Sequence, residues 1–358
     1  EAYFAAGEEA GYGFTKDYNG EMQEGFCRWQ MTIREGRRWS AANAYLYPAL
    51  TRPNLTLLTQ TLVTKILFEG DEAHGVAYEH AGQSKVAHAG EIILCGGAIN
   101  SPQILLLSGV GPADELRSHG IQVRIDRPGV GKNLQDHISA AVHYARKEPG
   151  PLHRQMRLDR IVFDLAKTYL HGSGISNDLP SGAMAYLKSD GEQPIPDIQI
   201  LFNAAPMTAS PYMAPFVKPY ADGFASRAIL LRPQSRGEVT LQSADPAQLA
   251  RIQQNFLTTD QDRVVLRRGL RMVAEIGGQK ALSPFVARQI MPNPDDLSDD
   301  VLDAHIAATG ITVHHPAGTC KMGADNDERA VVDQSCRIYG LRRLRVVDAS
   351  VMPDLVGG

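Results

Sequence analysis

The sequence contains little cysteine, no long apolar run and no excess of one charge. The four cysteines are Cys27, Cys95, Cys320 and Cys336, and no two of them form a CxxC pair. This usage predicts reduced thiols in a cytoplasmic compartment. The longest apolar runs, residues 92–95 and 104–107, are far too short to cross a membrane, so the sequence carries no strong membrane signal.

Charge is balanced along the chain. The formal net charge is −4 over 358 residues and both signs are well mixed, which argues against a nucleic-acid partner. The chain opens without methionine or a signal peptide and closes on a glycine pair, so we expect a segment of a longer polypeptide. No GxGxxG follows a predicted strand, so a self-contained dinucleotide site is not expected.

The length and the 43% apolar content predict two domains with sizeable cores. Short strands are expected from residue 54 onward, the first of them at residues 55–59. The continuously apolar residues 91–95 are typical of a strand covered on both faces. The helix that follows is expected to begin with Ser101 as its cap and Pro102 in its first turn.

Beyond Asp136 the pattern changes to strands separated by long loops, which predicts a mainly antiparallel sheet. Amphipathic periodicity predicts helices over residues 158–171, 260–278 and 298–309. The expected apolar side of the second helix consists of Val264, Leu266, Leu270, Val273 and Ile276.

Two adjacent histidines, His314 and His315, stand directly before Pro316. Adjacent side chains point apart in a helix or a strand, and the partners that zinc needs are not nearby, so a metal site is disfavoured. Two interpretations stay open on pattern alone. Both histidines are ordinary surface or core residues, or one of them is a catalytic base in an irregular loop that Pro316 and Gly318 shape.

Five stretches carry a family resemblance when they are taken together and in order. They are "GAINSPQILLLSGVGP" (97–112), "GVGKNLQDH" (129–137), "SRGEVTLQSADP" (235–246), "HHPAGTCKMG" (314–323) and "LRVVDASVMPDLVGG" (344–358). In this combination the chain resembles the glucose–methanol–choline family of flavin oxidoreductases over nearly its whole length. The resemblance implies binding of flavin adenine dinucleotide (FAD) and oxidation of an alcohol to a carbonyl compound.

The resemblance implies roles for individual residues. His315 matches the catalytic base, and His314 is expected to shape the pocket wall or to pack without a chemical role. The base's usual partner, Asn or His, would follow the end of this chain. The remaining positions are the FAD-contacting candidates Val63, Gly96, Gly97, Asp348 and Ala349, and a pair expected to be structural, Asp136 and His137.

The implied fold is a doubly wound α/β FAD-binding domain, incomplete here, with an α+β substrate domain. The expected boundaries are 1–136 for part of the FAD-binding domain with its lid or linker, 137–308 for the substrate domain, and 309–358 for the return that carries the catalytic loop.

The expected activity is oxidation of a primary alcohol to an aldehyde. Oxygen or a quinone or other carrier accepts the electrons, and the resemblance does not choose between oxidase and dehydrogenase. Choline-oxidising members of the family place a carboxylate in the substrate domain to meet the quaternary ammonium. The comparable residues 176–190 show Leu179, Pro180 and small residues near that place, which favours a neutral alcohol over choline. A hydroxynitrile lyase on the same fold and an inactive fragment unable to hold FAD are the alternatives.

Overall fold

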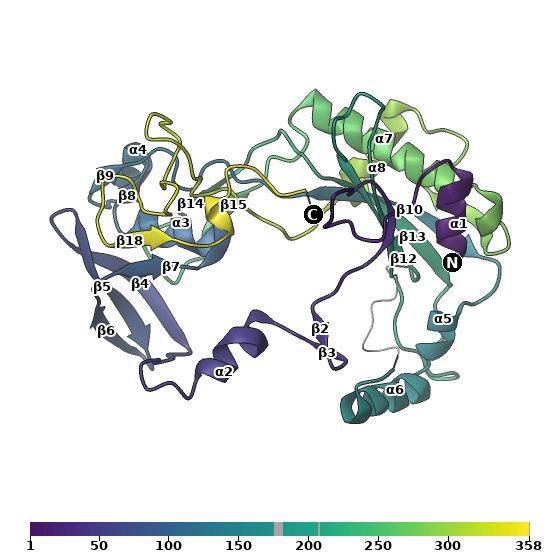
Figure 1. Ribbon diagram of the computed structural model, residues 1–358, viewed down its shortest axis with the longest axis horizontal. Coiled ribbons are helices and arrows are strands. Elements are labelled where there is room, and N and C mark those ends of the chain that lie inside the picture. Colours follow the sequence, from purple (N-terminus) through teal and green to yellow (C-terminus); the bar gives the residue numbers. More distant parts are fainter. Residues whose placement is uncertain (175–181, 207, 358) are drawn as a thin grey trace.

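The computed structural model describes residues 1–174, 182–206 and 208–357. Two lobes lie side by side (Figure 1). One lobe is built on a large sheet covered by helices, and the other holds several short sheets around helix α3 (Gly97–Leu107). Among the described residues, no helix combines the length and apolarity that a membrane span requires. All four cysteines are free.

The large sheet has seven strands and is antiparallel throughout, which confirms the predicted antiparallel sheet. Six strands follow one another across the sheet, and the seventh, β17 (Ile311–Thr312), pairs with one end of β10. The six are, in spatial order, β1 (Gly25–Arg28), β11 (Ala183–Leu187), β12 (Ile198–Asn203), β13 (Gly223–Leu230), β10 (Ile138–Arg146) and β16 (Val286–Met291).

Helix α7 (Asp260–Gly277) covers this sheet, with α8 (Asp299–Thr309) and α1 (Ala2–Glu9) beside it (Figure 1). The Thr259 hydroxyl caps α7 by accepting the N–H of Asp262 at 3.3 Å. Leu266 and Leu270 are fully buried against the sheet, and each contributes roughly 1.5–3 kcal/mol through its burial. The expected apolar side is right except at Val264, since Val265 is the buried neighbour.

The second lobe contains a three-stranded antiparallel sheet and a parallel pair. The sheet is β4 (Thr61–Glu69), β5 (Glu72–His80) and β6 (Gln83–His88), and the pair is β7 (Ile92–Leu94) with β18 (Leu344–Val346). The strand predicted at residues 55–59 is wrong, because that segment runs as coil into β4. The remaining elements are β2 (Ile33–Arg34), β3 (Arg37–Arg38), η1 (Ala42–Leu46), α2 (Tyr47–Ala49), β8 (Val110–Gly111), α4 (Ala113–Ser118), β9 (Ile125–Asp126), α5 (Pro151–Gln155), α6 (Leu158–His171), β14 (Glu238–Thr240), β15 (Arg251–Gln253), η3 (Lys280–Leu282) and η4 (Ala349–Val351).

Three placements add to the sequence expectation. Tyr3 of α1 and Phe26 of β1, from the range 1–136 expected to hold part of the FAD-binding domain with its lid or linker, belong to the core of the seven-stranded sheet. Within the range 137–308, Val239 of β14 packs in a cluster with Leu134 of the other lobe. Ile93 of β7 is 52% exposed, so one face of that strand lies open among the described residues.

Candidate active site

The segment 131–137 joins the loop that carries His314 and His315 to the rest of the molecule. It forms backbone hydrogen bonds with residues 237–239 on one side and with residues 313–319 on the other. On the second side the bonds are Val313 N–H to His137 C=O at 3.0 Å, Gln135 N–H to Ala317 C=O at 3.0 Å, Ala317 N–H to Gln135 C=O at 2.9 Å, and Gly131 N–H to Thr319 C=O at 2.8 Å. The histidine loop is therefore paired along almost its whole length.

Between Val313 and Ala317 the loop has no backbone bond to residues 131–137, and the carboxylate of Asp136 bonds this part of the loop instead. One carboxylate oxygen accepts the N–H of His315 at 2.9 Å, and the other accepts the hydroxyl of Thr312. The Thr312 oxygen in turn accepts the N–H of His314 at 2.9 Å. Asp136 is only 3% exposed, and hydrogen bonds to a buried carboxylate are among the stronger ones in proteins. Asp136 therefore fixes the backbone on which His315 stands.

The two histidines differ in backbone conformation and in surroundings. His314 has a φ of +66°, a left-handed conformation that costs a non-glycine residue roughly 1–3 kcal/mol. Both residues are exposed, and the His315 ring lies nearly perpendicular to the His137 ring, with 5.6 Å between centroids and 84° between planes.

His137 is a buried neutral neighbour for His315. Its Nδ1 lies 2.9 Å from the carbonyl oxygen of Leu230, so that nitrogen carries the hydrogen. Burial lowers the pKa of His137, and the nearby charge of His315 lowers it further. Burial therefore disfavours the protonated form of the His137 ring beside His315.

Asp348 organises the glycine turn at the start of α3. One of its oxygens accepts the N–H of Gly97 at 2.9 Å and the hydroxyl of Ser101 at 2.6 Å. The other accepts the N–H of Ser350 at 2.8 Å and its hydroxyl at 2.5 Å. Ser101 also accepts the N–H of Gly96 at 2.9 Å. The predicted Ser101 cap is therefore wrong, because α3 begins at Gly97 and Asp348 caps it from across the fold.

Pro102 lies inside α3 and links that helix to the histidine loop. Proline has no N–H, so the carbonyl of Ala98, one turn earlier, lacks its helical donor. The hydroxyl of Thr319 supplies the missing donor at 2.6 Å. The loop that begins at His315 is therefore bonded directly into the first turn of α3.

Gly318 brings the histidine loop against the end of β18. Its φ is +89°, and a Cβ there would lie 2.7 Å from the carbonyl oxygen of Asn133, so only glycine fits. The Gly318 N–H donates to the carbonyl of Ala349 at 3.1 Å, and the Cys320 N–H donates to that of Ser350 at 2.8 Å. Ala349 is thus bonded to Gly318, three residues after His315.

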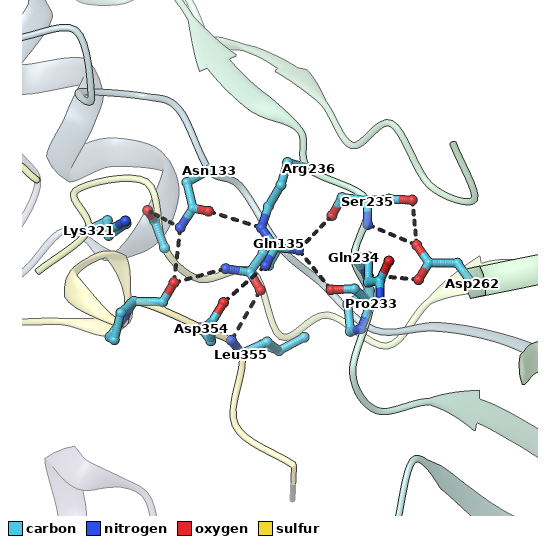
Figure 2. Close-up of polar contacts among 12 residues, drawn as sticks. Asn133, Gln135, Pro233, Gln234, Ser235, Arg236, Asp262, Lys321, Asp354 and Leu355 are labelled. Carbon is cyan, nitrogen blue, oxygen red and sulfur yellow. Dashed lines mark hydrogen bonds and ion pairs between the residues drawn. The ribbon is translucent and has the colours of Figure 1, made fainter. Parts of the chain in front are cut away.

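A polar junction beside this loop joins the two lobes. Figure 2 shows Arg236 between Asn133, which accepts its Nε–H at 3.0 Å, and Asp354, which pairs with its Nη2 at 3.0 Å. Gln135 accepts the N–H of Leu355 at 3.2 Å (Figure 2). Three of the stretches singled out in the sequence, 129–137, 235–246 and 344–358, therefore meet at this junction.

Six of the seven predicted site residues lie in one region of the fold and one does not. His315, Gly96, Gly97, Asp348 and Ala349 are linked through the bonds described above, and His314 occupies the turn next to His315. Val63 lies on β4, paired with Tyr78 of β5, in a different sheet. Sequence reasoning missed the positioning contacts of Asp136 and His137, which follow a glycine loop, and those of Arg236.

An open ledge lies where the parallel strands β7 and β18 end. Nothing lies within 4 Å of the position that a Cβ on Gly97 would take. Ile93 and Val347 are 52% and 46% exposed at this edge. Ligands of α/β sheets bind outside the carboxyl ends of the strands, so this ledge is suited to a flat, partly apolar ligand. Among the described residues, no three His, Cys, Asp or Glu side chains gather as a metal site.

Comparison with known proteins gives one consistent family. Family models described as GMC oxidoreductase match residues 1–139 and 233–358. The chain is 41% identical over 365 residues to the oxygen-dependent choline dehydrogenase of Brucella anthropi and 42% identical over 360 residues to the mitochondrial choline dehydrogenase of Homo sapiens. It matches over its whole length and spans 64% and 60% of those two proteins.

Solved structures agree with this result. The crystal structure of pyridoxine 4-oxidase from Mesorbium loti superposes with a TM-score of 0.86 at 31% identity. The alignment covers all of this chain and 65% of the other. A crystal structure of formate oxidase also superposes with a TM-score of 0.86, at 25% identity, and 66% of it is covered.

The role of Asp136 is testable against a matched control. Asp197 is also a buried carboxylate, 5% exposed, and accepts one backbone N–H and one hydroxyl, both from Ser189. We expect Asp136→Ala and Asp197→Ala each to lower the free energy of unfolding by about 2–3 kcal/mol, because buried donors lose their acceptor. Hydrogen exchange at residues 312–318 should accelerate only in Asp136→Ala. Equal acceleration in both variants would contradict the positioning role.

The lowered pKa of His137 predicts how stability depends on pH. As pH falls below the ordinary histidine pKa of 6.5, the unfolded chain binds a proton that the buried ring resists. Stability is therefore full above that pH and declines as pH falls, by up to about 1.4 kcal/mol per unit for this group. Urea titrations between about pH 7.5 and about pH 5.5 should show a shallower decline in His137→Asn. The same exchange at exposed His88 is the control, and an unchanged slope in His137→Asn would contradict the assignment.

Proposed function

The chain belongs to the GMC oxidoreductase family, and from that premise we propose that its protein oxidises an alcohol with bound FAD and with His315 as the base. The observation that carries this proposal is the exposed His315 imidazole on a backbone pinned by Asp136. The loop that carries His315 bonds through the Gly318 N–H to the carbonyl of Ala349, just after the end of β18 that borders the ledge. The chain spans between 60% and 64% of the curated relatives named above, so the proposal concerns the whole protein.

The residues present fit part of the FAD molecule. The Gly96–Gly97 turn leaves open space on its outer side, and the half-buried Ala349 is small enough for a flat ring system to approach. Both oxygens of Asp348 already accept two hydrogen bonds each, so Asp348 shapes the turn and presents its backbone to the cofactor. We assign Val63 to the adenine end, away from this cluster. Bound FAD supplies the acceptor for the hydride that leaves the alcohol carbon.

Residues of this chain accept the hydroxyl proton of the alcohol and position the group that accepts it. In this proposal a neutral imidazole nitrogen of His315 takes the hydroxyl proton of the alcohol, which allows hydride to leave the adjacent carbon. Burial lowers the pKa of His137 beside that ring, which disfavours transfer of the proton to His137. Asp136 holds the His315 N–H and touches neither substrate nor cofactor, so it is a positioning residue.

We propose a neutral primary alcohol as the substrate. The carboxylate among the described part of residues 176–190 is Asp190, and it forms an ion pair with Arg268. That pairing leaves it poorly suited to meet a substrate cation. Leu179 and Pro180, on which the sequence expectation rested, lie outside the described residues. The named relatives include choline dehydrogenases and a pyridoxine oxidase, so choline and pyridoxine are the informative competitors.

The assignment of the base is tested by a pair of neighbouring variants of the full-length protein. We expect His315→Ala to slow anaerobic flavin reduction by a primary alcohol by about 10²–10⁴-fold, the usual contribution of a general base. His314→Ala should slow it by less than about tenfold, because that ring is not assigned to the proton. The measurement is stopped-flow loss of oxidised-flavin absorbance, with benzyl alcohol, choline and pyridoxine as substrates.

Each other outcome has a distinct meaning. Equal losses in both variants would mean that the base is misassigned. Flavin that stays oxidised with every alcohol would contradict alcohol oxidation and would favour a lyase. A preference for choline would reject the neutral-alcohol substrate and leave the role of His315 intact. Purified protein without flavin absorbance would contradict the cofactor assignment.

A further inference from the structure

Helix α6 is amphipathic, but its apolar side faces solvent, whereas a surface helix normally turns that side toward the core. It stands with α5 at the edge of the large sheet, away from the core of that lobe (Figure 1). Its buried residue is Asp164, which lies with Thr168 against the chain at Gly174 just after the helix. The helix therefore turns polar side chains inward and its apolar side outward.

The exposed apolar side of α6 is continuous. Leu158, Val162, Leu165 and Tyr169 recur at the spacing of one helix face, and Phe163 and Leu170 flank them. The exposed fractions are Val162 57%, Phe163 73%, Tyr169 75% and Leu170 71%. Soluble proteins rarely leave such contiguous apolar surface uncovered unless it contacts a partner or a membrane.

A neighbouring turn extends this apolar surface. The N–H of Leu158 donates to the carbonyl of Tyr212 at 2.8 Å, which places residues 211–218 beside the start of α6. A bridge between Met213 and Val217 closes the turn, and Phe216 at its tip is 82% exposed. Helix and turn together present nine large apolar side chains to solvent: Leu158, Val162, Phe163, Leu165, Tyr169, Leu170, Met213, Phe216 and Val217.

Basic residues surround the apolar surface. The hairpin of β2 and β3 packs on the end of α6, where a Cβ on Gly36 would overlap the carbonyl of Gly172. Arg37 of that hairpin lies over the Tyr169 ring at 5.8 Å. Residues 33–38, 154–171 and 211–218 contain eight Lys or Arg and three acidic residues, whereas the whole chain has 36 basic and 40 acidic residues.

We propose that α6 and the turn at 211–218 form an interfacial anchor that binds the surface of an anionic phospholipid bilayer. An exposed apolar helix face bordered by Lys and Arg is the combination that lies in the headgroup region of a membrane. The local excess of positive charge complements anionic lipid, which the acidic chain as a whole does not. This binding is independent of the alcohol chemistry proposed above.

Vesicle co-sedimentation of the purified full-length protein tests the anchor. We expect binding to phosphatidylcholine vesicles that contain phosphatidylglycerol, weaker binding to pure phosphatidylcholine, and release by salt. Phe163→Ser and Phe216→Ser should each weaken partitioning by about tenfold or more. Arg160→Gln combined with Lys167→Gln should weaken binding to anionic vesicles alone.

Two control variants lie outside the patch. Leu249→Ser changes a side chain that is 80% exposed, and Arg251→Gln changes an exposed charge, and neither should alter partitioning. Flavin reduction by alcohol in detergent-free buffer should stay unchanged in the patch variants. The anchor is overturned if neither vesicle binds the protein or if the patch variants bind as wild type. It is also overturned if light scattering shows that Phe163→Ser dissociates an oligomer while vesicle binding is absent, because a second copy would then cover the face.

Discussion

The carboxylate of Asp136 is the contact on which the geometry of the candidate site depends. It accepts the His315 N–H and the Thr312 hydroxyl, and so bonds the part of the histidine loop between the backbone-paired Val313 and Ala317. A buried carboxylate is costly unless its lone pairs are bonded, so these donors stabilise Asp136 as much as Asp136 positions them. His314, directly before the residue whose N–H bonds to Asp136, takes a left-handed conformation.

Contacts of the same kind join stretches that are far apart in the sequence. Pro102 leaves a carbonyl of α3 free, and Thr319 of the histidine loop donates to it. Asp348 caps α3 from the end of β18. Arg236 ties Asn133 to Asp354 across the two lobes. Each stretch completes the hydrogen bonding of another, so the family resemblance reflects one assembled structure.

Local patterns predicted the local features of the fold well. The amphipathic helices at residues 158–171 and 260–278 stand where the sequence placed them, and the region beyond Asp136 supplies most strands of the predicted antiparallel sheet. The start of α3 was wrong because its cap comes from Asp348, 251 residues away from Gly97. The exposure of Ile93 and the outward apolar side of α6 depend on what packs where, which periodicity does not encode. His315 was identified through resemblance, whereas the Asp136 contact that holds it required the structure.

A double-mutant cycle between Asp136 and His315 tests the central claim most directly. Anaerobic flavin reduction by an alcohol would be measured in the wild type, in Asp136→Ala, in His315→Ala and in the double variant. If Asp136 acts by placing His315, removing Asp136 should slow the wild type but have little further effect once the imidazole is gone. Losses that add in full would contradict the account, because Asp136 would then act independently of His315.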